Sequence, residues 1–318
     1  MSTSGAYTFS VNRDQIVRLA MLNIGQLQDV EAPTPQEISD CALFLNMLVK
    51  QWMGKADFAP GLKTWTRRHG HLFLSGATGQ YTVGPGATGW TNSYLQTTLT
   101  AAAAGGQPVV AVTSVTGVTA GDKIGVQLAS GTLFWTTILS IASLNVTMAA
   151  NLPSAAASGA FVFTYTTTAQ QPDVIETAVL RDGAMNDTPL RMITLQEYDF
   201  LPSKANPLFI SDPSAIYHEF QLGNSTIFID CAGAQDVTKH IAMTYMEATQ
   251  DFVSATDTPS YPQEWYLPLA WGLGKQIAPM FNAPWTQNME DNYKMALAIA
   301  QKKEPERSAL FFQPGEDG

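Results

Sequence analysis

Two histidines are the residues of this chain most suited to holding a metal ion. His69 and His71 stand two positions apart, so on a β-strand their side chains would lie on one face. The neighbouring sequence offers no third ligand, and Arg67 and Arg68 directly precede the pair. We therefore interpret them as exposed strand histidines and expect no metal site.

A group of carboxylates could supply the acid–base pair of a hydrolase. Its members are Asp182, Asp187, Glu197 and Asp199. Thr194 followed by Glu197 has the spacing of a capping box at a helix start, and Asp182 precedes a glycine, as turn residues often do. We favour solvated turn and cap residues over a catalytic pair.

Other patterns for catalysis or cofactor binding are incomplete. Gly84 to Gly89 has the glycine spacing of a dinucleotide-binding loop, but no helix follows to face a pyrophosphate. Gly274-Lys275 lacks both the first glycine and the hydroxyl residue of a phosphate-binding loop. His218 and His240 fall in alternating strand patterns, and no G-x-S-x-G nucleophile accompanies them. We expect no enzyme, no catalytic residue and no cofactor.

The elements that carry these residues are indicated first by composition. Between Thr91 and Gln170 the only charged side chains are the neighbours Asp122 and Lys123, in a stretch rich in Ala, Gly, Ser, Thr and Val. The chain has 318 residues, enough for two domains of about 100 to 200 residues each. We predict an inserted domain at 91–170, carried by a discontinuous domain made of 1–90 and 171–303.

Short apolar runs between Gly, Pro and Ser turns predict β-strands through the middle of the chain. Inside the insertion they lie at 95–100, 109–115, 123–128, 133–141, 145–149 and 161–165. Outside it they lie at 69–74, 80–83, 174–180, 190–193, 216–221, 226–230 and 238–246, with 69–74 and 80–83 expected to form a hairpin. The insertion is predicted to be a small sandwich or barrel.

Both ends of the chain predict helices. Asn12 and Gln15 have capping-box spacing ahead of an apolar stripe, and Thr34 precedes a longer amphipathic helix. Near the other end, Pro262 starts a helix that is apolar nearly all round, and Thr286 caps a last one. The predicted helices cover about 13–24, 35–53, 262–281 and 286–303. The predicted fold class is α+β: a helical bundle from both chain ends with an antiparallel sheet, carrying the inserted all-β domain.

Charge and cysteine content exclude several classes of protein. The net charge of −10 argues against a surface that grips nucleic acid, because such a surface needs Lys and Arg to displace counterions. Cys41 and Cys231 are interpreted as small buried hydrophobes without a disulfide. No apolar run reaches the roughly 18 residues of a membrane helix, and the polar start is unlike a signal sequence. We expect no membrane anchor and a cytoplasm-like compartment.

Three short motifs carry a resemblance to a known family. They are Asp14 to Ala20 continuing to Gly25, then Thr34-Pro35-Gln36-Glu37 with the stripe that ends at Trp52, and near the other end Pro262 to Tyr266, Leu269 to Leu273 and Ile277-Ala278-Pro279. With them the chain resembles the head-to-tail adaptor proteins, or portal–tail connectors, of short-tailed bacteriophages. The resemblance covers roughly residues 10–90 and 171–312, so the charge-poor insertion lies outside it.

The resemblance implies a structural virion protein. Its copies would form a ring, a dodecamer in this family, below the portal, and would continue the DNA channel from capsid to tail. The implied partners are other copies of the chain, the portal protein, a downstream tail or nozzle protein, and double-stranded DNA that passes through the lumen without specific binding. The implied location is the neck and tail region of a virion assembled in the host cytoplasm.

Residues for two contacts follow from this expectation. The C-terminal tail, 304–318, would dock on the portal, with Leu310, Phe311 and Phe312 as candidate anchors; the alternative is that these three fold back on their own subunit. A helix without a polar face suits a subunit interface. The ring-interface candidates on that helix are Trp265, Tyr266, Trp271 and Ile277.

Two other functions compete with the adaptor. A receptor- or carbohydrate-binding virion module would use Trp90, Tyr94 and Trp135 as stacking platforms. A virion hydrolase would use the acids near Asp187, and its support in the sequence is the weakest.

Overall fold

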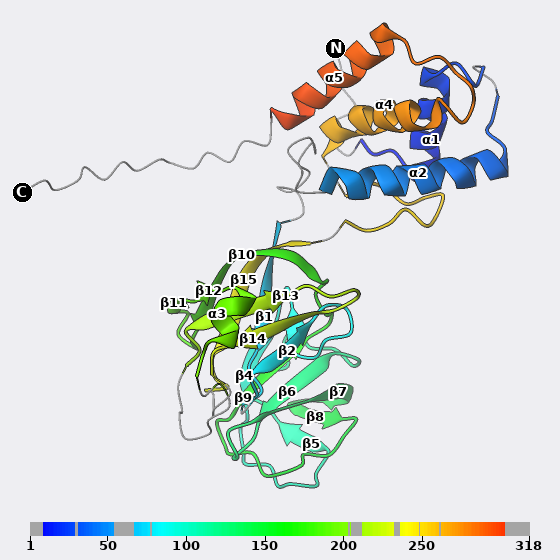
Figure 1. The fold of residues 1–318 in the computed structure, drawn as a ribbon. Coiled ribbons are helices and arrows are strands. Elements are labelled where there is room, and N and C mark those ends of the chain that lie inside the picture. Colours follow the sequence, from blue (N-terminus) through cyan, green and yellow to red (C-terminus); the bar gives the residue numbers. More distant parts are fainter. Residues whose placement is uncertain are drawn as a thin grey trace, which may run out of the picture. The chain divides into compact units, whose positions relative to one another are not determined.

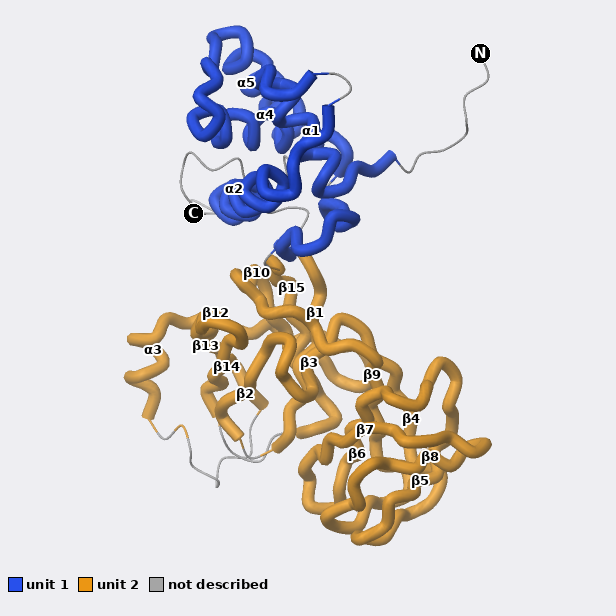
Figure 2. The backbone as a smooth tube through the Cα atoms, turned by 90° about the vertical axis from the view of Figure 1, so that its right-hand side faces the viewer, with its two compact units in different colours: residues 1–66, 249–318 blue, residues 67–248 orange. Residues whose placement is uncertain are grey.

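The structure is a computed structural model of the chain (Figure 1). It describes residues 9–28, 31–53, 67–76, 78–202, 204, 212–231, 236–247, 249–260 and 262–302. Helices and several β-sheets are both present, in agreement with the predicted mixture of α and β structure. The chain divides into two compact units, one of residues 1–66 and 249–318 and the other of residues 67–248 (Figure 2).

This division differs from the predicted boundaries at 91 and 170. The strands that precede and follow the insertion belong to the same unit as the insertion itself. One reason is a shared apolar cluster, in which Phe73 and Val237 from outside the predicted insertion pack with Leu133 and Phe163 from inside it. Scarcity of charge therefore marks one part of the second unit, and not a unit of its own.

Unit 1 is built from helices of both chain ends. They are α1 (Arg13–Asn23), α2 (Pro35–Met53), α4 (Tyr266–Ile277) and α5 (Gln287–Gln301), with a short 3-10 helix, η2 (Gln263–Trp265), before α4. Helix α4 contacts α1, α2 and α5, and side chains of all four helices enter one hydrophobic core. Its buried members include Ile16, Leu45, Leu269 and Ala300.

Local sequence explains where these helices begin and how closely they pack. Asn12 and Gln15 exchange two hydrogen bonds of 2.9 Å, so the predicted capping box of α1 is confirmed. Pro268 lies in the first turn of α4, where its missing N–H costs no intrahelical bond, and the helix continues past it. Gly272 lets α2 approach α4, because a Cβ there would stand 3.0 Å from Cζ2 of Trp52.

Unit 2 contains two sheets that share a core. The five-stranded sheet has the order β11-β10-β15-β1-β3, with β1 (Arg67–Phe73), β3 (Trp90–Thr91), β10 (Pro172–Arg181), β11 (Asp187–Pro189) and β15 (His240–Glu247). The four-stranded sheet has the order β12-β13-β14-β2, with β2 (Gln80–Val83), β12 (Arg191–Met192), β13 (Ala215–Glu219) and β14 (Ser225–Ile229). Buried side chains of both sheets form one cluster, which includes Leu72, Ile241, Ile227 and Val83.

Strands that are neighbours in the sequence form two antiparallel pairs in unit 2. β10 pairs with β11, and β13 pairs with β14, whereas β12, which lies within the predicted strand 190–193, pairs parallel with β13. The predicted hairpin of 69–74 with 80–83 is wrong, because β1 pairs with β15 and β3 while β2 pairs with β14. A short helix, α3 (Leu195–Asp199), follows β12, and Thr194 and Glu197 form its predicted capping box.

The six strands predicted for the insertion are all present and form one sheet. They are β4 (Leu95–Thr98), β5 (Val109–Ala111), β6 (Lys123–Gln127), β7 (Leu133–Ala142), β8 (Asn145–Met148) and β9 (Phe161–Tyr165), in the order β4-β9-β6-β7-β8-β5. An antiparallel bridge between Leu99 and Val112 joins the two edges of this sheet. The sheet is therefore curved like a barrel, and its interior is apolar, with Ile124, Val126 and Val162 fully buried.

Across the described ranges, no helix combines the length and the apolar character needed to cross a membrane.

Candidate functional site

The predicted contact residues of unit 1 have different positions in the structure. Leu310, Phe311 and Phe312, with the rest of the tail 304–318, lie outside the described residues. Trp265 and Ile277 are buried in the core of their own unit, so these two side chains are not available to a second subunit. Tyr266 is partly buried against the same core, and Trp271 is partly buried with its ring 6.3 Å from that of Trp285.

Unit 1 exposes apolar side chains on α4, where Leu267 is 57% exposed, and on other helices. Leu43 and Met47 of α2 are 57% and 56% exposed, and Met295 and Ile299 of α5 are 61% and 55% exposed. Each pair is four residues apart, so its members are neighbours on one helix face. The pair on α2 was not predicted, although two large apolar residues outside the buried stripe of an amphipathic helix indicate a second contact face.

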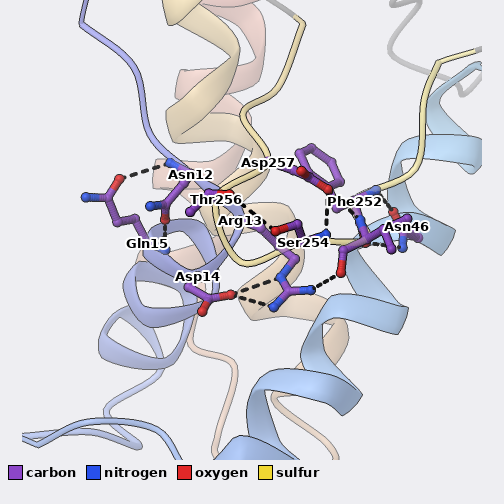
Figure 3. A network of polar contacts seen from close by, with 10 residues as sticks. Asn12, Arg13, Asp14, Gln15, Asn46, Phe252, Ser254, Thr256 and Asp257 are labelled. Atoms are coloured by element: carbon purple, nitrogen blue, oxygen red, sulfur yellow. Dashed lines mark hydrogen bonds and ion pairs between the residues drawn. The ribbon is translucent and has the colours of Figure 1, made fainter.

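A polar network holds the segment that leads into η2 against α1 and α2. Arg13 at the start of α1 is its centre (Figure 3): its backbone N–H donates to the carbonyl of Asp257 at 2.8 Å, and its Nη1 donates to the carbonyl of Val253 at 2.8 Å. The guanidinium also pairs with Asp14 at 2.9 Å. One arginine side chain thus joins the two ends of the chain within unit 1.

The same segment is held from α2 and by its own turn. Asn46 donates to the carbonyl of Phe252 at 3.2 Å and accepts its backbone N–H at 2.8 Å. The carboxylate of Asp257 accepts the N–H groups of Val253 and Ser254, and these bonds lower the pKa of Asp257. A cleft of about 350 Å³ is lined by residues 249–252 and 256–260 of this segment. Its polar groups serve to position backbone, and we assign no chemistry to it.

The three aromatic residues considered as stacking platforms are not equally available. Trp90 is completely buried, and its Nε1 donates to the carbonyl of Gln170 at 3.0 Å. Trp135 is partly buried over Gly125 and packs 5.5 Å from Phe73, so it belongs to the apolar cluster between the sheets. Trp90 is therefore a core residue, and only Tyr94 keeps a place at an open cleft.

The four candidate carboxylates have separate structural partners. Asp187 accepts two hydrogen bonds of 2.7 Å from Arg181, which lower its pKa. Asp182 closes its turn by accepting hydrogen bonds from Asn186, Glu197 caps α3, and Asp199 lies 3.8 Å from the ammonium of Lys204. This arrangement agrees with the turn-and-cap interpretation, since each carboxylate has its own hydrogen-bonding or ion-pair partner.

A histidine pair is the feature of unit 2 that the sequence did not reveal. Nδ1 of His71 on β1 lies 3.1 Å from Nε2 of His240 on β15, although 169 positions separate them in the chain. Their rings contact Tyr94 at 4.9 and 5.1 Å between centroids, and the ring of Phe73 lies 5.3 Å from that of His240. His240 is only 2% exposed and His71 is partly buried.

This environment keeps both imidazoles neutral at neutral pH. Burial, with the charges of Arg181 and His69 adding to it, lowers the pKa of His71 from 6.5 to about 4. Burial, His71 and Arg181 lower the pKa of His240 to about 3, while Asp187 opposes the shift. A neutral pair can share one hydrogen bond, with one ring nitrogen donating and the other accepting.

The histidine pair lacks the surroundings of a metal centre. His69 is exposed on the same strand and its Nδ1 lies 3.2 Å from the hydroxyl of Thr244. Within the part of the chain that the structure describes, no three His, Cys, Asp or Glu side chains are grouped so as to hold a metal ion. The pair's role in the fold is to connect β1 to β15 beside the aromatic cluster.

Comparison with known proteins adds no assignment: no protein-family model matches the chain, and no curated protein matches it.

Proposed function

We propose that this chain is a head-to-tail adaptor of a short-tailed bacteriophage, a structural protein of the virion without catalytic activity. Its copies form a ring, taken to be a dodecamer, below the portal. The ring continues the DNA channel toward a downstream tail or nozzle protein. In this proposal the helices of both chain ends form the bundle that meets the portal, and the tail 304–318 docks there through Leu310, Phe311 and Phe312.

The observation that carries the proposal is that unit 1 is assembled from segments of both chain ends. Helices α1 and α2 from the start of the chain and α4 and α5 from its end share one core, and the polar network around Arg13 joins them. These are the segments whose motifs resemble the adaptor family. A unit of this kind supports the proposal because the resembling motifs, far apart in sequence, belong to one structural element.

Exposed apolar side chains supply a contact surface for the ring. Leu43 and Met47 on α2 and Met295 and Ile299 on α5 belong to two different helices. A contact between the α2 face of one copy and the α5 face of the next is heterologous, and repetition of such a contact generates a closed ring when the rotation closes. These four residues replace Trp265 and Ile277 as the proposed contact residues.

Charge supports the proposed passage of DNA. The chain carries 27 acidic residues against 17 Lys and Arg, so its surface field repels phosphate. A lumen that repels phosphate lets a duplex move without adhering to the wall, whereas a basic lumen would bind it by counterion release.

The test is ring assembly after one charge is placed on the proposed contact. Met47→Asp should leave the purified chain folded, as circular dichroism will show, and should prevent rings by sedimentation velocity in the presence of the portal protein, because burial of an unpaired carboxylate opposes association. Leu139→Asp, at a side chain that is 60% exposed on the inserted sheet, is the matched control and should assemble normally. Equal assembly by both variants would contradict the proposed contact.

A further inference from the structure

A cleft of about 210 Å³ opens at one end of the barrel-like sheet. Leu95 pairs with Thr164 and Lys123 pairs with Tyr165, so the starts of β4 and β6 meet the end of β9 there. The residues that line the cleft come from these three places and from the turn at Gly117. Mouths of barrels are common ligand sites, because the strands fix the position of whatever lines them.

A buried carboxylate belongs to this cleft. Asp122 is 2% exposed, and its two oxygens accept the N–H and the hydroxyl of Thr119 at 2.7 and 3.0 Å. Among the ion pairs of the described residues, none includes Asp122. Each oxygen keeps a second lone pair, which can accept a hydrogen bond from a hydroxyl group of a ligand.

The other walls offer the remaining groups that recognise a sugar. Ser93 and Thr166 bring exposed hydroxyls that donate and accept hydrogen bonds, and Tyr94 brings a partly buried ring. An aromatic ring packs on the apolar face of a pyranose while hydroxyls and a carboxylate bind its polar edge. A calcium ion needs six to eight oxygen ligands, usually with several carboxylates, and this cleft has one.

We propose that this cleft binds one pyranose unit of a glycan. Asp122 accepts hydrogen bonds from sugar hydroxyls, and Tyr94 contacts the apolar face of the sugar. The proposal goes beyond the adaptor function and is independent of it, because the cleft lies in unit 2 and involves none of the ring contacts in unit 1.

The experiment is saturation-transfer NMR on the full chain with a panel of free sugars: glucose, galactose, mannose, rhamnose, N-acetylglucosamine and N-acetylgalactosamine. At least one sugar should receive magnetisation from the wild-type protein. Asp122→Asn should weaken its Kd about tenfold or more, the usual effect of losing a charge-assisted hydrogen bond. Ser93→Trp, at an exposed position on the rim, should abolish the signal by filling the cleft. Ala157→Trp, at an exposed position in the connection between β8 and β9 and outside the cleft, should bind like wild type.

Three outcomes would overturn the proposal. One is the absence of transfer to every sugar of the panel. Another is binding that survives Ser93→Trp unchanged, which would place the sugar elsewhere; this variant keeps the test valid if Asp122→Asn fails to fold. A third is a change in the NMR spectrum of the protein on addition of calcium chloride alone, if Asp122→Asn removes that change. The cleft would then be a cation site. Asp122→Asn, Ser93→Trp and Ala157→Trp all lie in unit 2 and should assemble into rings like wild type. Failure of sugar binding is therefore distinguishable from failure of the adaptor proposal.

Discussion

Acidification should weaken unit 2 through its buried histidine pair. In the folded protein the pKa of His71 is lowered from 6.5 to about 4 and that of His240 to about 3. The unfolded chain, in contrast, takes up these protons as the pH falls through about 6.5. Since the unfolded state binds more protons below pH 6.5, the free energy of unfolding is highest above that value. It then falls with the pH until the folded pKa values are reached.

The size of the loss follows from the pKa values. One pKa unit corresponds to about 1.4 kcal/mol, so at pH 4 the lowered pKa of His240 costs about 3 kcal/mol of stability. His71 contributes less, about 2 kcal/mol, because water screens the charge at its exposed edge. Together the two histidines remove a large part of the roughly 5 to 15 kcal/mol that stabilises a typical domain.

The assay must report on unit 2 alone, because the two units need not unfold together. Samples equilibrated in urea at several pH values are given a short pulse of deuterium at one fixed pH. Mass spectrometry then measures protection of the peptides that contain β1 and β15. The double variant His71→Gln/His240→Gln should show a shallower loss of stability between pH 6.5 and 4 than wild type, and His69→Gln, at the exposed histidine of the same strand, should behave like wild type. Equal slopes for wild type and the double variant would show that the histidine pair does not cause the loss of stability.

Two further substitutions, one of them with a matched control, test the packing of unit 2 and the polar network of unit 1. Gly70→Ala would place a Cβ 2.1 Å from Cη2 of the buried Trp90 and should cost about 3 kcal/mol in urea unfolding. Gly183→Ala, whose Cβ meets nothing closer than 3.7 Å, should be nearly neutral, and a similar loss in both variants would contradict the packing argument. Arg13→Ala removes the bond to the carbonyl of Val253 and should destabilise this contact by about 2 kcal/mol. Hydrogen exchange of residues 249–260 should then accelerate, and unchanged exchange would speak against a positioning role for Arg13.

The parts of the fold that were predictable from sequence depend on neighbouring residues. The capping pairs Asn12 with Gln15 and Thr194 with Glu197 are formed as predicted, because the hydrogen bonds join residues three apart. The six strands of the insertion also lie where their alternation placed them. The type of these elements was therefore predictable, as was the mixture of helices and sheets, whereas the short strands β3 and β11 were not predicted.

Pairing between strands that are far apart in the chain could not be predicted from the sequence. His71 and His240 meet because β1 pairs with β15, and nothing local to either residue specifies this partner. The same reason explains the wrong hairpin of β1 with β2 and the shift of the unit boundary from Thr91 to Arg67. Composition reports which residues a segment contains, whereas unit boundaries depend on which segments it contacts.

The partner that covers an apolar helix was also not predictable from the sequence. The predicted helix 262–281 was expected to offer Trp265 and Ile277 to another subunit, yet both side chains are buried in the core that η2 and α4 share with α1, α2 and α5. An apolar face predicts that something covers it and does not identify the covering partner. The candidate cleft at Asp122 was also beyond reach, because its walls come from three strands that meet only in the folded sheet.

The proposed function depends on ring formation on a portal, which electron microscopy of the full chain mixed with the portal protein of the same phage can observe. We expect a ring of twelve copies stacked on the portal, coaxial with its channel, and the loss of that ring in Met47→Asp. A chain that stays monomeric beside an intact portal would rule out the adaptor function.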